Sequence, residues 1–427
     1  MSARRPLVCA PLVLLACCGT PGKPALGTGS GSGSEPVFFT QPAPIPTRLD
    51  RDVIGKRADP LIGSRLPGGR PASYPSNQRY RPSHRIRMPT AFARFAAAPD
   101  GSAVVVATGV PDYVIVLRDL DRADQDLTIH LGMQGAGRPG WNWHGYLAER
   151  AAWCTTPSPM VVLAGERTVW AIDPATWSEL PGFPVLLPTK FISAVECLPD
   201  GAIAVGEGAG GSDGHGNLTI LERSGKLRFS VRVHKYYPRS LAVMPSGVVG
   251  SETPTGFATW DPTTGKQLSA RTIAPKSQRS FEVDGRMAAS PVAEQLAIVI
   301  HDFGRLHPFL ADAPDFEPHP IAALEALFKG DKDRDYALGV GDTTALAYSP
   351  DGRTLVVGGL EANHVWGSDT WDHRVLWVLR DGKLIDTLVG HSGYIVDVAV
   401  LADGRILALD DANQLGGGDL VVWEPKP

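Results

Sequence analysis

The sequence contains little cysteine, has a small net charge and lacks several common catalytic motifs. It has five cysteines in 427 residues, none paired at zinc-finger spacing, so a zinc site built on cysteine pairs is excluded. Its formal net charge of -4 is too small for this length to indicate a nucleic-acid partner. It contains no GxSxG nucleophile elbow, HExxH motif or glycine-rich phosphate loop. We therefore expect neither an enzyme of these classes nor a nucleic-acid-binding protein.

Proline and glycine, by contrast, are abundant and recur in a repeating frame. Asp-Gly turns stand between short apolar runs at residues 99–101, 199–201, 350–352 and 402–404, and such turns are strong hairpin signals. Third strands, each closed by a turn into a fourth, are expected at residues 169–173, 257–261 and 377–380. Four strands in a unit of roughly 40 to 50 residues are the repeat of a propeller blade.

Scattered motif pieces make the chain similar to the WD-repeat propellers from about residue 84 to the C-terminus. These pieces are Gly390-His391, Trp260-Asp261 and the turn at 350–352. The resemblance implies a propeller fold and, for His391, a buried structural role beside Asp410 or Asp411. It implies little about activity, because propellers host unrelated functions.

The predicted fold class is all-β: a seven-bladed β-propeller closed by N- and C-terminal strands and preceded by a disordered tether. The blades are expected to open near Phe92, Ala148, Phe191, Pro238, Ser280, Thr343 and Ser392. The last blade supplies only three strands of its own, at residues 395–401, 405–409 and 420–423. The segment His84 to Met88 is the natural fourth strand, which would leave no bare sheet edge. Deleting either end should therefore unfold the domain.

The N-terminus predicts the location of the protein. Arg4-Arg5 and the apolar stretch from Leu7 to Ala16 indicate a secretory leader, too short to span a membrane as a helix. Residues 14–17 resemble a bacterial lipobox, which implies a lipid on Cys17 and, with Cys18 following it, the outer membrane. The alternative is an ordinary leader that is cleaved nearby.

Three domains follow from this assignment. We assign residues 1–16 to the signal peptide, 17–83 to a flexible linker rich in Gly, Ser, Pro and Arg, and 84–427 to the propeller. The basic residues of the linker are expected to be solvated rather than bound to lipid or cell-wall phosphates.

Cys154 and Cys197 are the only cysteines of the predicted propeller. Both fall in first strands of adjacent blades, where a free cysteine commonly behaves as a small buried apolar residue. The cell envelope permits a disulfide. Facing strands of neighbouring blades, however, need not bring two Cα atoms close enough to bridge. We expect two free thiols.

The long loops nearly all join a second strand to a third, or one blade to the next, so they emerge on one face of the propeller. They carry aromatic and histidine side chains, which suit a recognition surface. We expect the partner-binding face to include Trp141, Trp143, His144, Tyr236, Tyr237, Trp366 and Trp371. The alternative is that these aromatic side chains only cover the ends of the blades.

The densest group of ligand-like residues is His364, Asp369, Asp372 and His373. A propeller hydrolase or lactonase would need such residues to converge around a metal in the central channel, where the metal would activate water. Loop histidines are more often solvated or bonded to backbone.

An insertion in or after the fifth blade offers a second candidate for metal binding. It begins with a short helix after Pro320, whose predicted apolar face carries Ile321, Leu324, Leu327 and Phe328. The loop after it resembles an EF-hand calcium loop through Asp331, Asp333, Asp335 and Asp342. Tyr336 stands where that loop requires glycine, so we favour a solvated charged loop and expect no cofactor.

The sequence thus predicts a non-catalytic, monomeric, membrane-tethered propeller that binds another protein and serves as a scaffold in the bacterial cell envelope. The alternative is a metal-dependent hydrolase or lactonase-like enzyme, or a small-ligand binder, that uses the central channel. A third reading, a propeller lipoprotein that helps to assemble outer-membrane barrels, is less favoured because those proteins typically have a different blade motif and number.

Overall fold

The structure is a computed structural model. It describes residues 43–44, 49, 51–53, 77–88, 94–107, 113–131, 150–208, 215–234, 237–253, 256–273, 285–302, 305–329, 345–360, 374–391, 394–411 and 418–427. All of them belong to one compact unit, Val37–Pro427.

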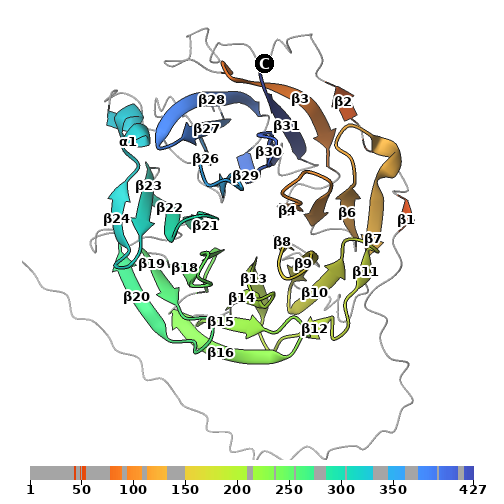
Figure 1. Ribbon diagram of the computed structural model, residues 1–427, viewed down its shortest axis with the longest axis vertical. Helices are drawn as coiled ribbons and strands as arrows, with labels where there is room; N and C mark the ends of the chain where they lie inside the picture. Colours follow the sequence, from red (N-terminus) through yellow and green to blue (C-terminus); the bar gives the residue numbers. More distant parts are fainter. Residues whose placement is uncertain are drawn as a thin grey trace, which may run out of the picture. The chain divides into compact units, whose positions relative to one another are not determined.

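Seven antiparallel sheets form the blades of a ring (Figure 1). Blade 1 contains β4 (Arg94–Ala97), β5 (Val104–Ala107), β6 (Tyr113–Leu117) and β7 (Leu127–His130), with β1 (Ala43–Pro44) at its outer edge. Blade 2 contains β8 (Arg150–Cys154), β9 (Met160–Gly165), β10 (Thr168–Asp173), β11 (Ser178–Glu179) and β12 (Val185–Leu186). Blade 3 contains β13 (Phe191–Cys197), β14 (Ile203–Gly208), β15 (Gly216–Leu221) and β16 (Leu227–His234).

The remaining blades follow in chain order. Blade 4 contains β17 (Leu241–Val243), β18 (Val249–Thr253), β19 (Gly256–Trp260) and β20 (Gln267–Thr272). Blade 5 contains β21 (Gly285–Ala289), β22 (Gln295–Asp302), β23 (Arg305–Asp312) and β24 (Glu317–Pro320). Blade 6 contains β25 (Leu346–Tyr348), β26 (Thr354–Leu360), β27 (Arg374–Arg380) and β28 (Lys383–His391). Blade 7 contains β29 (Tyr394–Val400), β30 (Ile406–Asp411), β31 (Asp419–Pro425), β3 (Tyr80–Arg87) and, outermost, β2 (Arg51–Val53).

The predicted count of seven blades is confirmed, including the second and fifth, whose sequence patterns are weak. Each of the four Asp-Gly turns predicted from the sequence joins the first strand of a blade to the second. In blade 1, the backbone N–H of Ser102 donates to Oδ1 of Asp100 at 2.9 Å, and Gly101 adopts a φ of 73°. The Ser102 amide holds the pKa of Asp100 below its ordinary value. Glycine is favoured because that φ lies in the left-handed region.

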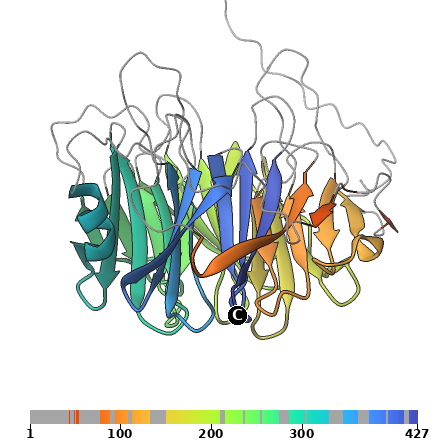
Figure 2. The same cartoon turned by 90° about the horizontal axis from the view of Figure 1, so that it is seen from above.

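These turns define a face that we call the turn face, which is the lower face in Figure 2. Connections from first to second strands and from third to fourth strands lie there. The opposite face, which we call the loop face, carries the ends of the second strands and the starts of the first strands. All the loops predicted to bind a partner attach to strand ends on the loop face.

The hydrophobic core consists of seven clusters, one at each boundary between neighbouring blades. Each blade therefore buries both of its faces, which explains why strands such as Val104–Ala107 are buried at every position instead of alternating. The boundary between blades 7 and 1 is packed like the others, through Ile86, Phe95 and Leu407 among others. The ring is closed by hydrophobic contact as well as by hydrogen bonds.

Among the described residues, two short helices accompany the strands: α1 (Ala322–Lys329), which follows β24, and the 3-10 helix η2 (Ala123–Gln125), which lies between β6 and β7. The helix predicted after Pro320 is thus confirmed, and Ile321 and Leu324 are buried against blade 6 as its apolar face requires. Within the described ranges, no helix is both long enough and apolar enough to cross a membrane.

The strand predicted to close the ring is confirmed as β3, which pairs antiparallel with β31 from Tyr80 opposite Pro425 to Arg87 opposite Asp419. β3 begins at Tyr80, four residues before the predicted start at His84. The carboxylate of Asp386 on β28 accepts the backbone N–H groups of Gln78, Arg79 and Tyr80 at 2.9, 2.7 and 3.1 Å. The range 17–83, predicted as a flexible linker, therefore contains β1, β2 and the start of β3.

We predict that Asp386→Ala loosens the start of β3. Its side chain is buried, and removal leaves four backbone donors, the three at the start of β3 and that of Thr387, without their charged acceptor. The expected loss in the free energy of unfolding is about 3 kcal/mol. Urea denaturation measures it. The matched control in the same blade is Asp381→Asn, which removes the charge of an exposed ion pair with Arg353, keeps a residue type that tolerates the φ of 49°, and should lower stability far less. Equal losses in the two variants would contradict the assigned role of Asp386.

The structural role implied for His391 is confirmed. Its Nδ1 lies 3.5 Å from Oδ2 of Asp410, and Trp423 donates from Nε1 to its Nε2 at 3.3 Å. Both ring nitrogens face buried partners, so this histidine ties the entry of blade 7 to β30 and β31 and is enclosed by the fold.

Candidate functional site

Most residues predicted from the sequence to have functional roles lie outside the described residues. This holds for Cys17, for Trp141, Trp143, His144, Tyr236, Trp366 and Trp371 of the partner face, for His364, Asp369, Asp372 and His373, and for Asp331, Asp333, Asp335 and Asp342. Lipidation, the loop tryptophans and the calcium loop stay predictions. Tyr237 is the member of the predicted partner face that the structure describes.

Tyr237 lies on the loop face, just before the first strand of blade 4. Its ring packs edge-on against Phe191, with 4.7 Å between the ring centroids, and the guanidinium of Arg239 lies 5.5 Å from its ring centroid. The side chain is partly exposed. It therefore covers the junction of blades 3 and 4 and also holds an arginine at the mouth of the central channel.

The central channel is lined by residues from all seven blades and has a cavity volume of about 140 Å³. Its charged lining comes from the first strands or from the residues just before them. Four cations and two carboxylates lie there: Arg94, Arg150, Arg239, Arg286, Glu196 and Asp397. The sequence analysis missed this cluster because its members come from different blades and follow no local motif.

Two of these arginines bind the inner strand of the neighbouring blade. Arg150 donates from Nε to the carbonyl oxygen of Ser193 at 2.6 Å, and Arg94 donates from Nη1 to that of Val396 at 2.5 Å. A carbonyl oxygen accepts one of the five N–H groups of a guanidinium and leaves its charge in place. These two arginines thus join neighbouring blades around the channel.

Burial is the main cause of the raised pKa of both channel carboxylates. It raises the pKa of Glu196 to about 7, with a smaller contribution from repulsion by Asp397. Burial also raises the pKa of Asp397, although Arg94 and Arg286 oppose that shift. Among the described residues, no group of three or more histidine, cysteine, aspartate or glutamate side chains could hold a metal ion. The described part of the channel therefore offers cations and not a metal-ligand set.

A second concavity lies on the turn face between blades 1 and 2. It has a volume of about 1040 Å³ and is lined by turns of blades 1, 2 and 3. The rings of Trp153 and Trp177 meet edge to face in it, with 6.4 Å between their centroids. The side chain of Trp177 is 7% exposed and belongs to the hydrophobic core. The side chain of Trp153 is half-buried, and that of Arg118 is exposed at the rim. We call this concavity the tryptophan groove.

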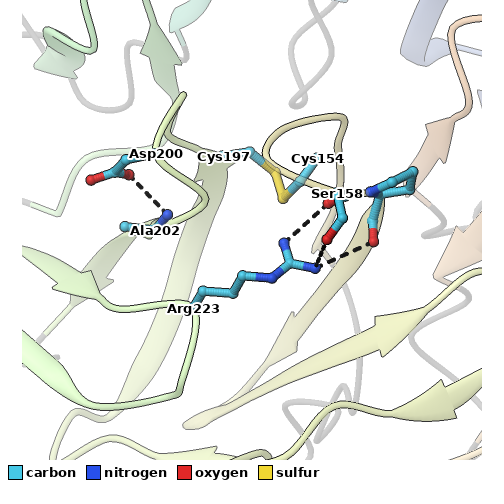
Figure 3. The surroundings of a disulfide bond; sticks show 7 residues. Cys154, Ser158, Cys197, Asp200, Ala202 and Arg223 are labelled. Atoms are coloured by element: carbon cyan, nitrogen blue, oxygen red, sulfur yellow. Dashed lines mark hydrogen bonds between the residues drawn. A yellow bond between two sulfur atoms is a disulfide. The ribbon is translucent and has the colours of Figure 1, made fainter.

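The prediction of two free thiols is wrong: Cys154 and Cys197 form a disulfide (Figure 3). The two residues end the first strands of blades 2 and 3, and the innermost strands of neighbouring blades converge around the channel. Their Cα atoms are 5.3 Å apart, a normal distance for a bridge. Beside the bridge, Arg223 of blade 3 donates to the hydroxyl oxygen of Ser158 of blade 2 at 2.8 Å. The edge of the tryptophan groove is thus braced.

Comparison with solved structures supports the propeller fold. One match is a chain from the crystal structure of a mitotic checkpoint complex, with a TM-score of 0.57, 13% identity, and coverage of 84% of this chain and 96% of that chain. Another is the β-propeller domain of Cps50 (Swd1) from Myceliophteria thermophila, with a TM-score of 0.56, 12% identity, and coverage of 81% and 100%. No protein-family model matches the chain, and no curated protein matches it. The protein has the fold of a WD-repeat-like β-propeller.

Proposed function

We propose that the protein is a non-catalytic, membrane-tethered propeller that binds another protein of the bacterial cell envelope. The observation that carries the proposal is the tryptophan groove, a large concavity on a rigid closed ring. Tryptophan and arginine are the residue types that contribute most to binding at protein interfaces. Propellers of similar fold occur in protein assemblies, among them the chain of the mitotic checkpoint complex.

The groove favours one kind of occupant, an extended segment of a partner protein that carries a bulky apolar side chain and an acidic one. Its volume of about 1040 Å³ accepts several side chains. The half-buried ring of Trp153 offers an apolar contact in the groove. At the rim, Arg118 has no ion pair within the described part of the chain, so a partner carboxylate would pair with it.

The acids of the groove are already engaged in their own turns. Asp100 accepts from the backbone of Ser102, and Asp173 accepts from the backbone of Ala175 at 2.9 Å and from the hydroxyl of Thr176 at 3.2 Å. These two acids stabilise the turns at the rim, and they do not compete with a partner's carboxylate for Arg118. The partner's acidic side chain is therefore directed to Arg118.

The proposed location rests on the predicted lipoprotein leader at the N-terminus. A lipid on Cys17 would anchor the chain, since each buried methylene contributes about 0.8 kcal/mol, and the linker would keep the propeller near the membrane. Tethering raises the local concentration of the propeller near envelope partners without any chemistry. The Cys154–Cys197 disulfide supports an oxidising compartment such as the envelope. The aromatic loops of the loop face remain a second predicted surface.

Site-specific photocrosslinking in cells tests the proposal. A photoreactive amino acid replaces Thr155, an exposed residue of the groove whose replacement leaves Arg118 in place, or Trp366 of the predicted partner face. Leu268, which is 50% exposed on the outer strand of blade 4, serves as the control position. We expect a discrete adduct with one protein from position 155 and none from position 268. Adducts from position 366 alone would exclude the groove and retain the scaffold. An absence of adducts at both 155 and 366 would contradict protein binding.

A further inference from the structure

The chain before β3 contacts the outer edges of three neighbouring blades. β1 pairs with β7 of blade 1, and β2 pairs with β3 of blade 7 (Figure 1). Further along the chain, the backbone N–H of Asn77 donates to the carbonyl oxygen of Thr387 in blade 6 at 2.8 Å. Its side-chain amide exchanges two hydrogen bonds with the backbone of Val389, at 3.0 and 3.1 Å. This part of the chain therefore follows the outside of the ring across the boundary that β3 closes.

β1 makes the weakest of these three contacts. It pairs over two residues, with Ala43 opposite Thr128 and Pro44 opposite Leu127, whereas β2 pairs over three. Proline has no backbone N–H, so Ala43 carries the one backbone donor of β1. Proline is also depleted in strands. So short a pairing opens at little cost in free energy, and we expect β1 to leave β7 and return while β3 stays in place.

The edge that β1 covers is continuous with the tryptophan groove. Leu127, which lies opposite Pro44, also lines the groove, and so does Arg118, which directly follows β6 in the same hairpin. β1 runs towards the groove, because Ala43 lies opposite the second residue of β7 and Pro44 opposite the first. An extended segment with the same direction would pair with β7 and then enter the groove with its next residues.

Strand addition to a sheet edge is a recurring way in which proteins bind extended peptides. The backbone hydrogen bonds supply affinity for any sequence, while side-chain pockets supply specificity. At this site the backbone of β7 would supply the first contribution, and Trp153 and Arg118 of the groove the second. A segment without proline opposite Leu127 has a backbone N–H that Pro44 lacks, so it would pair with β7 better than β1 does.

We propose that β1 is a displaceable strand: the partner segment that fills the tryptophan groove replaces β1 and pairs antiparallel with β7 at Leu127 and Thr128. This inference rests on the proposed function, because it describes how that partner segment binds. Released β1 remains a competitor, since residues 45–50 allow it to move at most about 20 Å from β2. Such an intramolecular competitor acts at a high effective concentration. It therefore limits the site to segments that pair with β7 better than Ala43 and Pro44 do.

Two variants of the full-length chain change the occupancy of β7 by β1 in opposite directions. In the first, a Gly-Ser repeat of equal length replaces residues 41–46, which raises the entropy cost of forming β1. In the second, Pro44→Val supplies a backbone N–H and a side chain that favours strands. The matched control carries the same Gly-Ser repeat in place of residues 21–26, which precede β1 in the chain.

Hydrogen exchange of the purified variants tests the cover on β7 without a partner. We expect the backbone amides of β7 to exchange faster in the Gly-Ser variant of residues 41–46 and more slowly in Pro44→Val. The control should exchange as the wild type does. Exchange of β7 that is the same in all four chains would overturn the proposal, because β1 would then not protect this edge.

Photocrosslinking in cells from position 155 of the same variants tests the displacement. We expect the yield of the protein adduct to rise about threefold in the Gly-Ser variant of residues 41–46 and to fall about threefold in Pro44→Val. Equal yields in all chains would overturn the displacement of β1 and leave protein binding at the groove intact. No adduct from positions 155 and 366 in any chain would refute the proposed function, and with it this inference.

Discussion

A chain that begins at Met88, and so lacks β3, is expected to lose the cooperative fold. Without β3, the edge of β31 is unpaired, and apolar partners of Tyr80 and Ile86 in blades 6, 7 and 1 face water. Seven boundaries between blades hold the ring together. Removing β3 takes away part of the hydrophobic cluster at two of these boundaries at once. We expect no cooperative urea transition and pronounced aggregation, measured by circular dichroism and light scattering.

Two controls distinguish loss of the closing strand from mere shortening. A chain that begins at residue 77 retains β3 and its contacts with Asp386, and should unfold with nearly the full-length midpoint. A permuted chain carries residues 77–88 after Pro427. Because Tyr80 stands opposite Pro425, a short turn would join β31 to β3 as a hairpin, and the fold should return. A chain from Met88 that unfolds cooperatively at the full-length midpoint would refute closure by β3.

The second large effect is expected from the disulfide. Replacing Cys154 and Cys197 with serine opens a covalent loop whose ends are 43 residues apart, and the chain-entropy account gives a loss of about 4 kcal/mol in the free energy of unfolding. Urea denaturation of the double variant against the oxidised wild type measures this loss. The wild type in reductant should approach the double variant, and the double variant should not respond to reductant.

Identical urea midpoints for the oxidised wild type and the double variant would contradict this prediction, because they would mean that the bridge does not constrain the unfolded chain. An effect on binding is also expected, since Thr155 and Ser158 beside the bridge line the tryptophan groove. Reduced protein should therefore form less adduct from position 155.

Features encoded by short stretches of sequence could be predicted. The Asp-Gly turns need only a side chain that accepts a backbone N–H and a glycine with positive φ, so residues such as Asp100 and Gly101 reveal them directly. The missing fourth strand of blade 7 could be predicted by counting strands. The short helix could be predicted from the spacing of Ile321 and Leu324.

Features made by contacts between blades could not be predicted in the same way. Cys154 and Cys197 are joined because the inner strands of neighbouring blades converge around the channel, a distance that neither strand encodes alone. Similarly, Arg94 and Arg239 reach one channel from blades far apart in sequence. The groove that contains Trp153 and Trp177 depends on how the turns of adjacent blades pack.

Photocrosslinking combined with replacement of the leader tests whether the protein is a tethered propeller that binds another protein. The photoreactive amino acid is placed at position 155 in the full-length chain and in a chain whose residues 1–17 are replaced by an ordinary cleavable secretory leader. After irradiation, cells are fractionated and the adduct is quantified. We expect the same protein adduct in both chains, in the membrane fraction for the full-length chain and less strongly membrane-bound after replacement of the leader. No adduct in either chain, or a distribution unaffected by the leader, would contradict a tethered, protein-binding propeller.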